Sequence, residues 1–155
     1  MESVKKEGIS MNQLARIAKC QGTSVQVLRR LNVSQTRQLI KKSVKGNPDG
    51  SFEFVAASYD RKTLGQTGTG HFSPVAAYDP QTDSVLVLDV ARFKYGPHWV
   101  PIEDLVAATM PLDPATGLPR GFMTFRKIQV NREAAPEKCI LQSCTEKCKN
   151  EVEVQ

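Results

Sequence analysis

The sequence has no uninterrupted apolar stretch long enough to cross a bilayer, and no charged start followed by an apolar run of signal-peptide length. Nothing in it therefore predicts a transmembrane helix or a secretory leader. The chain has 155 residues, of which 40% are hydrophobic, and this length does not demand more than one core. We expect a soluble, cytoplasmic protein with no membrane partner.

Cysteine is scarce over most of the chain. Of the four cysteines, only Cys20 precedes residue 139, and Cys139, Cys144 and Cys148 crowd the C-terminal end. A secreted disulfide scaffold of this size would spread more cysteines through the fold, so we expect a reducing compartment. The charged, cysteine-containing segment 131–155 is expected to be a flexible tail that follows a single domain at 1–130.

Aromatic residues make up only 6% of the sequence, and none lies among the basic residues that carry much of its net charge of +5. This pattern predicts a solvated basic helix face and argues against a nucleic-acid partner. A positive field would still favour small anionic substrates. The basic residues in question are Arg29, Arg30, Arg37, Lys41, Lys42 and Lys45.

The first third of the chain reads as helical. Ser10 is a good N-cap for a segment with apolar residues at helical spacing, which Gly22 ends, and a second helix is expected from near Ser34. A dense turn signal at 46–50 marks the change to strands. Those strands are expected at 52–58, 72–78, 84–90 and 121–127, with a short helix at 101–110.

The second and third of these strands are expected to form a hairpin through residues 79–83. The run Val85 to Leu88 is apolar at every position, which predicts a strand buried on both faces. With helices first and a mainly antiparallel sheet after them, the pattern predicts an α+β fold.

One histidine stands where a glycine-rich loop meets a strand. Glycines before His71 would let a substrate's backbone approach the imidazole closely, and the hairpin would return Asp89 to its side. An aspartate in that place fixes the tautomer of the imidazole and stabilises the imidazolium. On these residues alone, a structural hydrogen-bonded pair and a catalytic pair both fit.

The sequence segments that contain this pair are a more specific signal than the pair alone. The segments QTGTGHFSP at 66–74 and LDVARFKYGPHWVP at 88–101 strongly resemble the phytochelatin synthase family, and the resemblance extends roughly from Val4 to Arg126. It implies a papain-like cysteine peptidase fold, of which this chain holds mainly the antiparallel-sheet lobe with N-terminal helices, the first lobe being incomplete.

The resemblance also implies a chemistry. Members of the family are glutathione γ-glutamylcysteinyltransferases: they release glycine from glutathione, hold the γ-glutamylcysteinyl group on a cysteine, and pass it to another glutathione. The products, phytochelatins, chelate heavy metals and so detoxify them. No organic cofactor is implied, and cadmium or zinc enters as metal–glutathione thiolates.

Site residues follow from the same resemblance. The family's catalytic histidine and aspartate fall on His71 and Asp89, which would act as the acid–base group and its orienting partner. Arg92 and Tyr95 match positions that handle substrate. Asp113 matches, with Arg120, a pair that holds the ammonium and carboxylate of the γ-glutamyl end. For either member of that last pair alone, a surface salt bridge or a loop cap fits equally well.

The family's nucleophilic cysteine lies well before the histidine, and the match begins after it. The resemblance thus implies a chain that is N-terminally truncated and inactive alone. Cys20 falls near the C-terminal end of a predicted helix, the wrong end to lower a thiol pKa or hold an oxyanion. The competing interpretation is a non-catalytic glutathione- and metal-binding module.

Two further expectations concern surfaces. Cys139, Cys144 and Cys148 could bind a soft metal weakly, but a closed zinc site needs a fourth ligand. His98 is not expected to be that ligand, because it lies inside the motif between Pro97 and Trp99.

An incomplete first lobe would leave an exposed apolar patch on the histidine side of the fold. Such a patch favours self-association.

Overall fold

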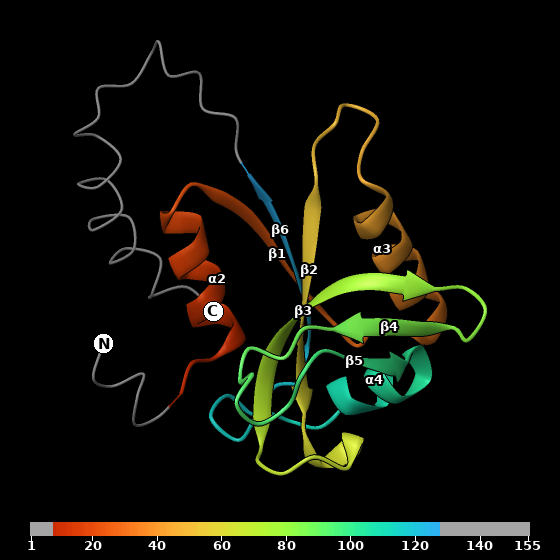
Figure 1. Ribbon diagram of the computed structural model, residues 1–155. Coiled ribbons are helices and arrows are strands. Elements are labelled where there is room, and N and C mark those ends of the chain that lie inside the picture. The colour runs from red at the N-terminus through yellow and green to blue at the C-terminus, as the bar shows by residue number, and fades with distance from the viewer. Residues whose placement is uncertain (1–7, 128–155) are drawn as a thin grey trace.

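A six-stranded sheet with helices on both faces organises the part of the chain that the computed structural model describes, residues 8–127 (Figure 1). Neighbouring strands pair antiparallel in the order β1-β6-β2-β3-β4-β5, so the expected α+β class is confirmed. The elements are α2 Met11–Cys20, β1 Thr23–Arg29, α3 Val33–Lys45, β2 Glu53–Asp60, the 3₁₀ turn η1 Lys62–Leu64, β3 Gly70–Asp79, β4 Ser84–Val87, β5 His98–Pro101, α4 Ile102–Thr109 and β6 Gly121–Lys127.

Side-chain caps explain where the first two helices begin. The Ser10 side chain accepts from the Gln13 N–H while the Gln13 side chain accepts from the Ser10 N–H, which is a capping box. Asn32 and Gln35 repeat the arrangement at the start of α3. Both helices therefore begin where the sequence predicted, within a residue.

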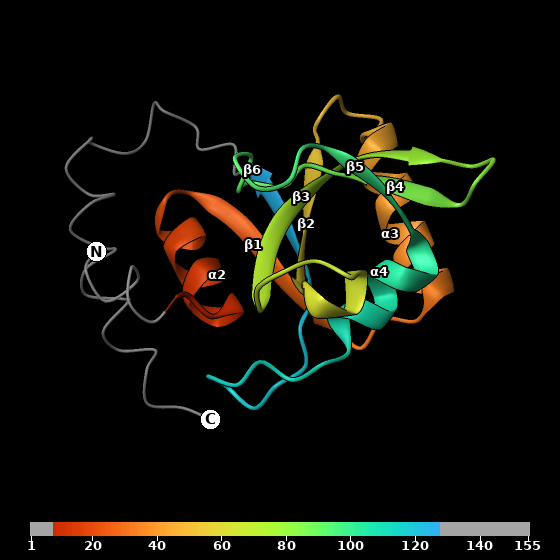
Figure 2. The same cartoon turned by 60° about the horizontal axis from the view of Figure 1, so that its bottom comes forward.

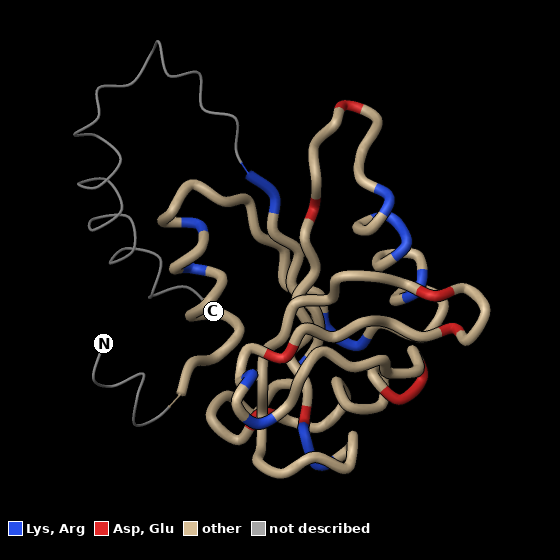
Figure 3. Tube along the Cα trace, viewed as in Figure 1, with Lys and Arg blue, Asp and Glu red and all other residues tan. Residues whose placement is uncertain are grey.

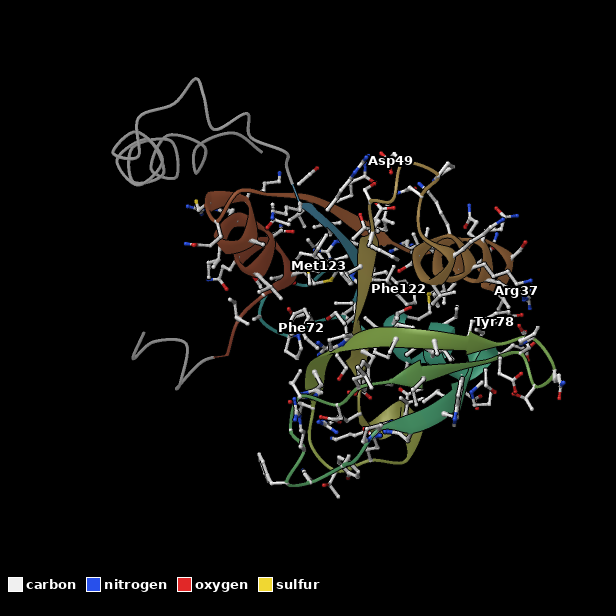
Figure 4. The ribbon with its side chains drawn as sticks, turned by 45° about the horizontal axis from the view of Figure 1, so that its top comes forward. Arg37, Asp49, Phe72, Tyr78, Phe122 and Met123 are labelled. Atoms are coloured by element: carbon white, nitrogen blue, oxygen red, sulfur yellow. The ribbon has the colours of Figure 1, made fainter. Side chains whose placement is uncertain are left out.

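The sheet separates two apolar clusters (Figures 1 and 2). On one face α2 packs through Met11 and Ala15, while α3 and α4 cover the other face. Strand β6 contributes to both clusters, because successive residues point to opposite faces: Phe122 lies on the α3 side and Met123 on the α2 side (Figure 4). Both side chains are fully buried.

Two strands were not predicted. Residues 23–29, read as part of a helical first third, form the edge strand β1, and residues 98–101 form the other edge strand, β5. Strand β1 pairs with β6, from Thr23↔Lys127 to Arg29↔Gly121. The partner lies about a hundred residues further along the chain, so no local periodicity could reveal the pairing.

The expectation for the apolar run in β4 was wrong. Val85 and Val87 are fully buried, but Leu86 is only half-buried and Leu88 is 37% exposed. The buried valines belong to the cluster under α3 and α4, whereas the cluster under α2 takes no residue of β4. Within residues 8–127, helices cover this part of the sheet on one face only, whereas most of β6 is buried on both faces.

The predicted basic helix face is correct for the basic residues of α3 and wrong for Arg29 and Arg30, which precede that helix. Lysine and arginine gather along α3 (Figure 3). There Arg37 forms a two-bond contact with Asp83, at 2.8 and 2.6 Å. Arg29 instead lies on β1, half-buried, and donates to the carbonyl of Pro119 and to Asn12 Oδ1. It joins α2, β1 and the loop before β6.

Candidate active site

His71 is the second residue of β3 and lies opposite Tyr59 of β2 in the sheet. The two rings meet edge to face, with centroids 5.8 Å apart. Tyr59 is fully buried and its hydroxyl lies 3.2 Å from Ser73 Oγ, so a fixed aromatic wall supports one side of the imidazole. The His71 side chain keeps 18% of its surface exposed, which leaves it accessible to a substrate.

Asp89 lies where the hairpin was expected to bring it. Strand β4 ends at Val87, but the Leu88 N–H still donates to the Pro74 carbonyl at 2.9 Å, which continues the pairing with β3. Asp89 Oδ1 then lies 2.8 Å from His71 Nε2, and the carboxylate side chain is fully buried. The predicted contact between histidine and aspartate is confirmed.

The contact fixes which ring nitrogen can act. A carboxylate only accepts hydrogen bonds, so Nε2 of His71 carries the proton that Asp89 receives. In the neutral ring Nδ1 then holds the lone pair. Any proton that His71 takes from a nucleophile must arrive at Nδ1.

Sequence reasoning missed Arg61, the buried partner of this pair. Its Nη2 lies 3.0 Å from Asp89 Oδ1 and 2.8 Å from Oδ2, and its side chain is 5% exposed. Its Nη1 donates to Gln66 Oε1 at 2.9 Å, and its guanidinium lies 4.9 Å from the centre of the Tyr95 ring. The one local signal was an arginine placed directly after a strand of β-formers and before the glycine-rich loop.

The charges of the site set its protonation. Burial by itself raises the pKa of Asp89, but hydrogen bonds from the Ala91 N–H and from His71, together with the charge of Arg61, outweigh it and hold that pKa below its ordinary value. Burial lowers the pKa of His71, the hydrogen bond to Asp89 raises it, and the charge of Arg61 lowers it. The net result is a pKa below the ordinary value. Near neutral pH the pair is therefore a carboxylate and a neutral imidazole.

The glycine-rich loop is tied to the segment that follows Asp89. Tyr95 Oη accepts from the Thr67 N–H at 2.8 Å, and Lys94 Nζ donates to the Thr67 carbonyl at 3.0 Å. Tyr95, a predicted substrate-binding residue, thus lies at the site and holds this loop. Arg92, predicted with it, is exposed, and its role toward a substrate stays a prediction.

Gly70 serves a different purpose from the one expected. The guanidinium of Arg120 occupies the space where a Cβ on residue 70 would stand, so this glycine admits an arginine and not a substrate backbone. Arg120 is 6% exposed and its Nε is buried without a hydrogen-bond partner. A buried guanidinium beside the residue that precedes His71 is suited to hold an anion.

Asp113, predicted to act with Arg120, is used locally. Its carboxylate accepts from the Ala115 N–H at 3.2 Å and from the Thr116 hydroxyl at 3.4 Å, which caps the loop before β6. Among the ion pairs of residues 8–127, none joins Asp113 to Arg120. The loop-cap alternative therefore describes Asp113 in this structure, and its role toward a substrate stays a prediction.

Cysteine and metal expectations fall mostly outside the described residues. Cys20 is half-buried at the last position of α2, the expected and unfavourable end for a nucleophile. Cys139, Cys144 and Cys148 lie outside residues 8–127. Within those residues, no group of three or more His, Cys, Asp and Glu side chains could hold a metal ion.

Two apolar side chains are exposed in the segment that follows Asp89, and an apolar patch on the histidine side of the fold stays a prediction. Val90 and Phe93, in the segment just after Asp89, are 62% and 94% exposed. Self-association through this surface stays a prediction. No helix within residues 8–127 is long and apolar enough to cross a membrane.

Comparison with known proteins decides the family. A family model described as phytochelatin synthase matches residues 1–122, which include His71, Asp89 and the loops that hold them. The chain belongs to the phytochelatin synthase family. The resemblance expected from the two glycine- and aromatic-bearing segments is confirmed.

Relatives within the phytochelatin synthase family come from plants and yeast. The chain is 42% identical over 123 residues to glutathione gamma-glutamylcysteinyltransferase 2 of Arabidopsis thaliana, covering 79% of this chain and 27% of that protein. It is 39% identical over 131 residues to transferase 3 of Lotus japonicus, covering 83% and 26%. Against the Schizosaccharomyces pombe transferase it is 32% identical over 133 residues, covering 84% and 31%. The chain thus spans about a quarter to a third of these relatives.

Proposed function

We propose that this chain carries the acid–base pair of a papain-like glutathione γ-glutamylcysteinyltransferase, with the nucleophilic cysteine on a segment outside it. The single observation that carries the proposal is the 2.8 Å contact between His71 Nε2 and the buried Asp89 carboxylate. It leaves Nδ1 as the proton acceptor on the accessible side chain. The names of the relatives support the choice of glutathione as substrate.

The proposed first half-reaction follows from that geometry. Nδ1 of His71 takes the proton of the cysteine thiol, and the thiolate attacks the carbonyl carbon of the Cys–Gly peptide bond in glutathione. As the C–N bond breaks, the imidazolium returns the proton to the departing amine of glycine. The γ-glutamylcysteinyl group then remains as a thioester. Asp89 stabilises the imidazolium and holds the ring in one orientation throughout.

The second half-reaction reverses the proton's path. The α-amino group of another glutathione attacks the thioester, His71 Nδ1 takes the proton that this amine loses, and the thiolate leaves and is reprotonated. The product is the glutathione chain lengthened by one γ-Glu-Cys unit. We propose that cadmium or zinc takes part as the metal–glutathione thiolate substrate.

Arg120 is the residue best suited to bind substrate. Its guanidinium is buried beside Gly70, with an unbonded Nε, and would pair with the α-carboxylate of the γ-glutamyl end. Asp113 would have to exchange its loop contacts for the substrate's ammonium. Calorimetry with glutathione at millimolar concentration tests this assignment. We expect binding that Arg120→Gln weakens and that Arg126→Gln, on the half-exposed pair with Asp49, leaves unchanged. Absence of binding by the unsubstituted chain would count against this assignment.

The non-catalytic module is the competing function, and its supporting observation is that Cys20 stands at the unfavourable end of α2. One experiment separates the two. The chain alone, and the chain joined to the cysteine-bearing N-terminal segment of a relative, are incubated with glutathione and cadmium, and released glycine is measured. Acyl transfer predicts glycine from the joined protein only. A joined protein that binds glutathione and releases no glycine would establish the module.

A further inference from the structure

The two histidines of the sequence are joined by one continuous line of polar contacts. From His71 it passes to Asp89, then to Arg61 and Gln66, and Gln66 Nε2 lies 3.0 Å from His98 Nε2. His98 Nδ1 lies 2.9 Å from the Gly96 carbonyl. Donors and acceptors alternate without conflict along this line. Gly96 O accepts from Nδ1–H, His98 Nε2 accepts from the Gln66 amide, and Gln66 Oε1 accepts from Arg61.

Arg61 lies in the middle of that line, and both its backbone and its side chain make contacts that fix its position. Its own N–H donates to the Thr69 carbonyl, and its carbonyl accepts from the N–H groups of Leu64 and Gln66. The ring of Tyr95 covers one face of the guanidinium, and a Cβ added at Gly68 would stand 3.3 Å from Arg61 Cδ. An arginine that is fixed at backbone, stem and head is placed with little freedom to move.

We propose that Arg61 is a positioning residue for the acid–base pair: it acts through Asp89, and Gln66 and His98 hold its guanidinium in the required place. This inference rests on the proposed function, because it assigns Arg61 a task in that reaction. Arg61 does not touch the reacting atoms.

Two physical effects make up the task. First, Asp89 Oδ1 receives His71, the Ala91 N–H at 2.8 Å and Arg61, and with Arg61 also close to Oδ2 the carboxylate has one orientation. Second, the positive charge of the guanidinium offsets the negative charge of Asp89, so that the carboxylate orients His71 through the Nε2 proton without holding a second proton on Nδ1. A base that must take a proton from a thiol has to be neutral beforehand.

Other charged and titratable groups around His71 do not replace this effect. Tyr59 faces the imidazole from β2, and its pKa is raised by burial. The charge of Lys94, in the segment after Asp89, lowers the pKa of His71 less than the charge of Arg61 does. Arg120 lies beside Gly70. Arg61 alone among these cations contacts the carboxylate directly.

Because the sequence has only two histidines, nitrogen-15 NMR of the isolated chain can follow the imidazole of each one separately. A pH titration follows the imidazole of residue 71, assigned by its loss in His71→Gln. We expect Arg61→Met to move the titration midpoint of His71 upward, because the buried carboxylate then stabilises the imidazolium without opposition. Arg37→Met is the matched control, since it also removes an arginine from a two-bond contact, with Asp83, and should leave His71 unmoved. A folded Arg61→Met chain whose His71 midpoint is unchanged or lower overturns the inference.

Arg61→Lys decides the question if Arg61→Met does not fold. Its ammonium can pair with Asp89 but cannot also donate to Gln66 in the geometry of the guanidinium fork. We expect the His71 Nε2–H to exchange with solvent faster than in the parent chain, while the backbone spectrum stays dispersed. An unchanged exchange rate overturns the inference.

Activity adds a separate readout in the protein joined to the cysteine-bearing segment. There Arg61→Lys should lower kcat on the order of a hundredfold with little change in KM, because it displaces the base and not the substrate. A joined parent protein without transferase activity would instead remove the proposed function. The shift of the His71 midpoint would still be measured in the isolated chain, so the two failures are distinguishable.

Discussion

The guanidinium of Arg120 occupies the space that a side chain on Gly70 would need. Residue 70 directly precedes the histidine of the site. The backbone that positions His71 therefore packs directly against Arg120, the arginine proposed to bind substrate. A change at either residue is therefore expected to act on both.

Gly70→Ala is predicted to destabilise the protein and weaken glutathione binding together. The new methyl would overlap Arg120, and forcing extra atoms into a packed site typically costs about 1–3 kcal/mol. Gly96→Ala is the matched control, because a Cβ there meets nothing within 4 Å. Urea unfolding and calorimetry measure the two effects. Equal stability and affinity in both alanine variants would show that Arg120 is not held as described.

Asp89→Asn is predicted to be among the most destabilising changes in the site. It removes the charge that pairs with the buried Arg61, and loss of one partner of a buried ion pair costs about 3 kcal/mol or more. Asp49→Asn breaks a half-exposed pair with Arg126 and should change little. Urea unfolding at neutral pH compares them. Similar losses in both variants would contradict the burial of the Arg61–Asp89 pair.

Stability is predicted to fall as the pH drops below the ordinary pKa of histidine, about 6.5. Folding depresses the pKa of His71, so between the ordinary and the folded value the unfolded chain binds a proton that the folded chain excludes. The stabilisation is complete above that window and is lost as the pH falls through it. In His71→Gln this part of the pH dependence should disappear. Identical curves of unfolding free energy against pH for the two chains would be the contrary result.

Local signals in the sequence predicted the elements that depend on local chemistry. Ser10 caps α2, as expected, and the limits of β6 were predicted to the residue. The edge strands β1 and β5 were missed: β1 pairs with β6, which is distant in the sequence, and β5 is a short strand that pairs with β4 across the loop after Asp89. Exposed Ser24 and Gln26 alternate with Val25 and Val27 in β1, a strand-like pattern that the helical interpretation of the first third overlooked.

The residues of the site were likewise predicted only in part. His71 and Asp89 were predictable because one hairpin connects them and because the surrounding segments carry the family's pattern. Arg61 was not, since a buried arginine and a solvated one look alike in sequence and its partner lies 28 residues away. Only the folded loop, which turns the guanidinium inward under Tyr95, distinguishes it from the basic residues of α3.

Transfer activity in the protein joined to a cysteine-bearing N-terminal segment tests the central claim most directly, with glycine release and phytochelatin formation followed by mass spectrometry. If Nδ1 of His71 moves the proton, His71→Ala should lower kcat by about a hundred- to ten-thousandfold while the protein stays folded. Arg37→Ala, on α3 where the side chain pairs with Asp83 of the β3–β4 turn, should retain full activity (Figure 4). A His71→Ala protein that transfers γ-glutamylcysteine as fast as its parent would contradict the account.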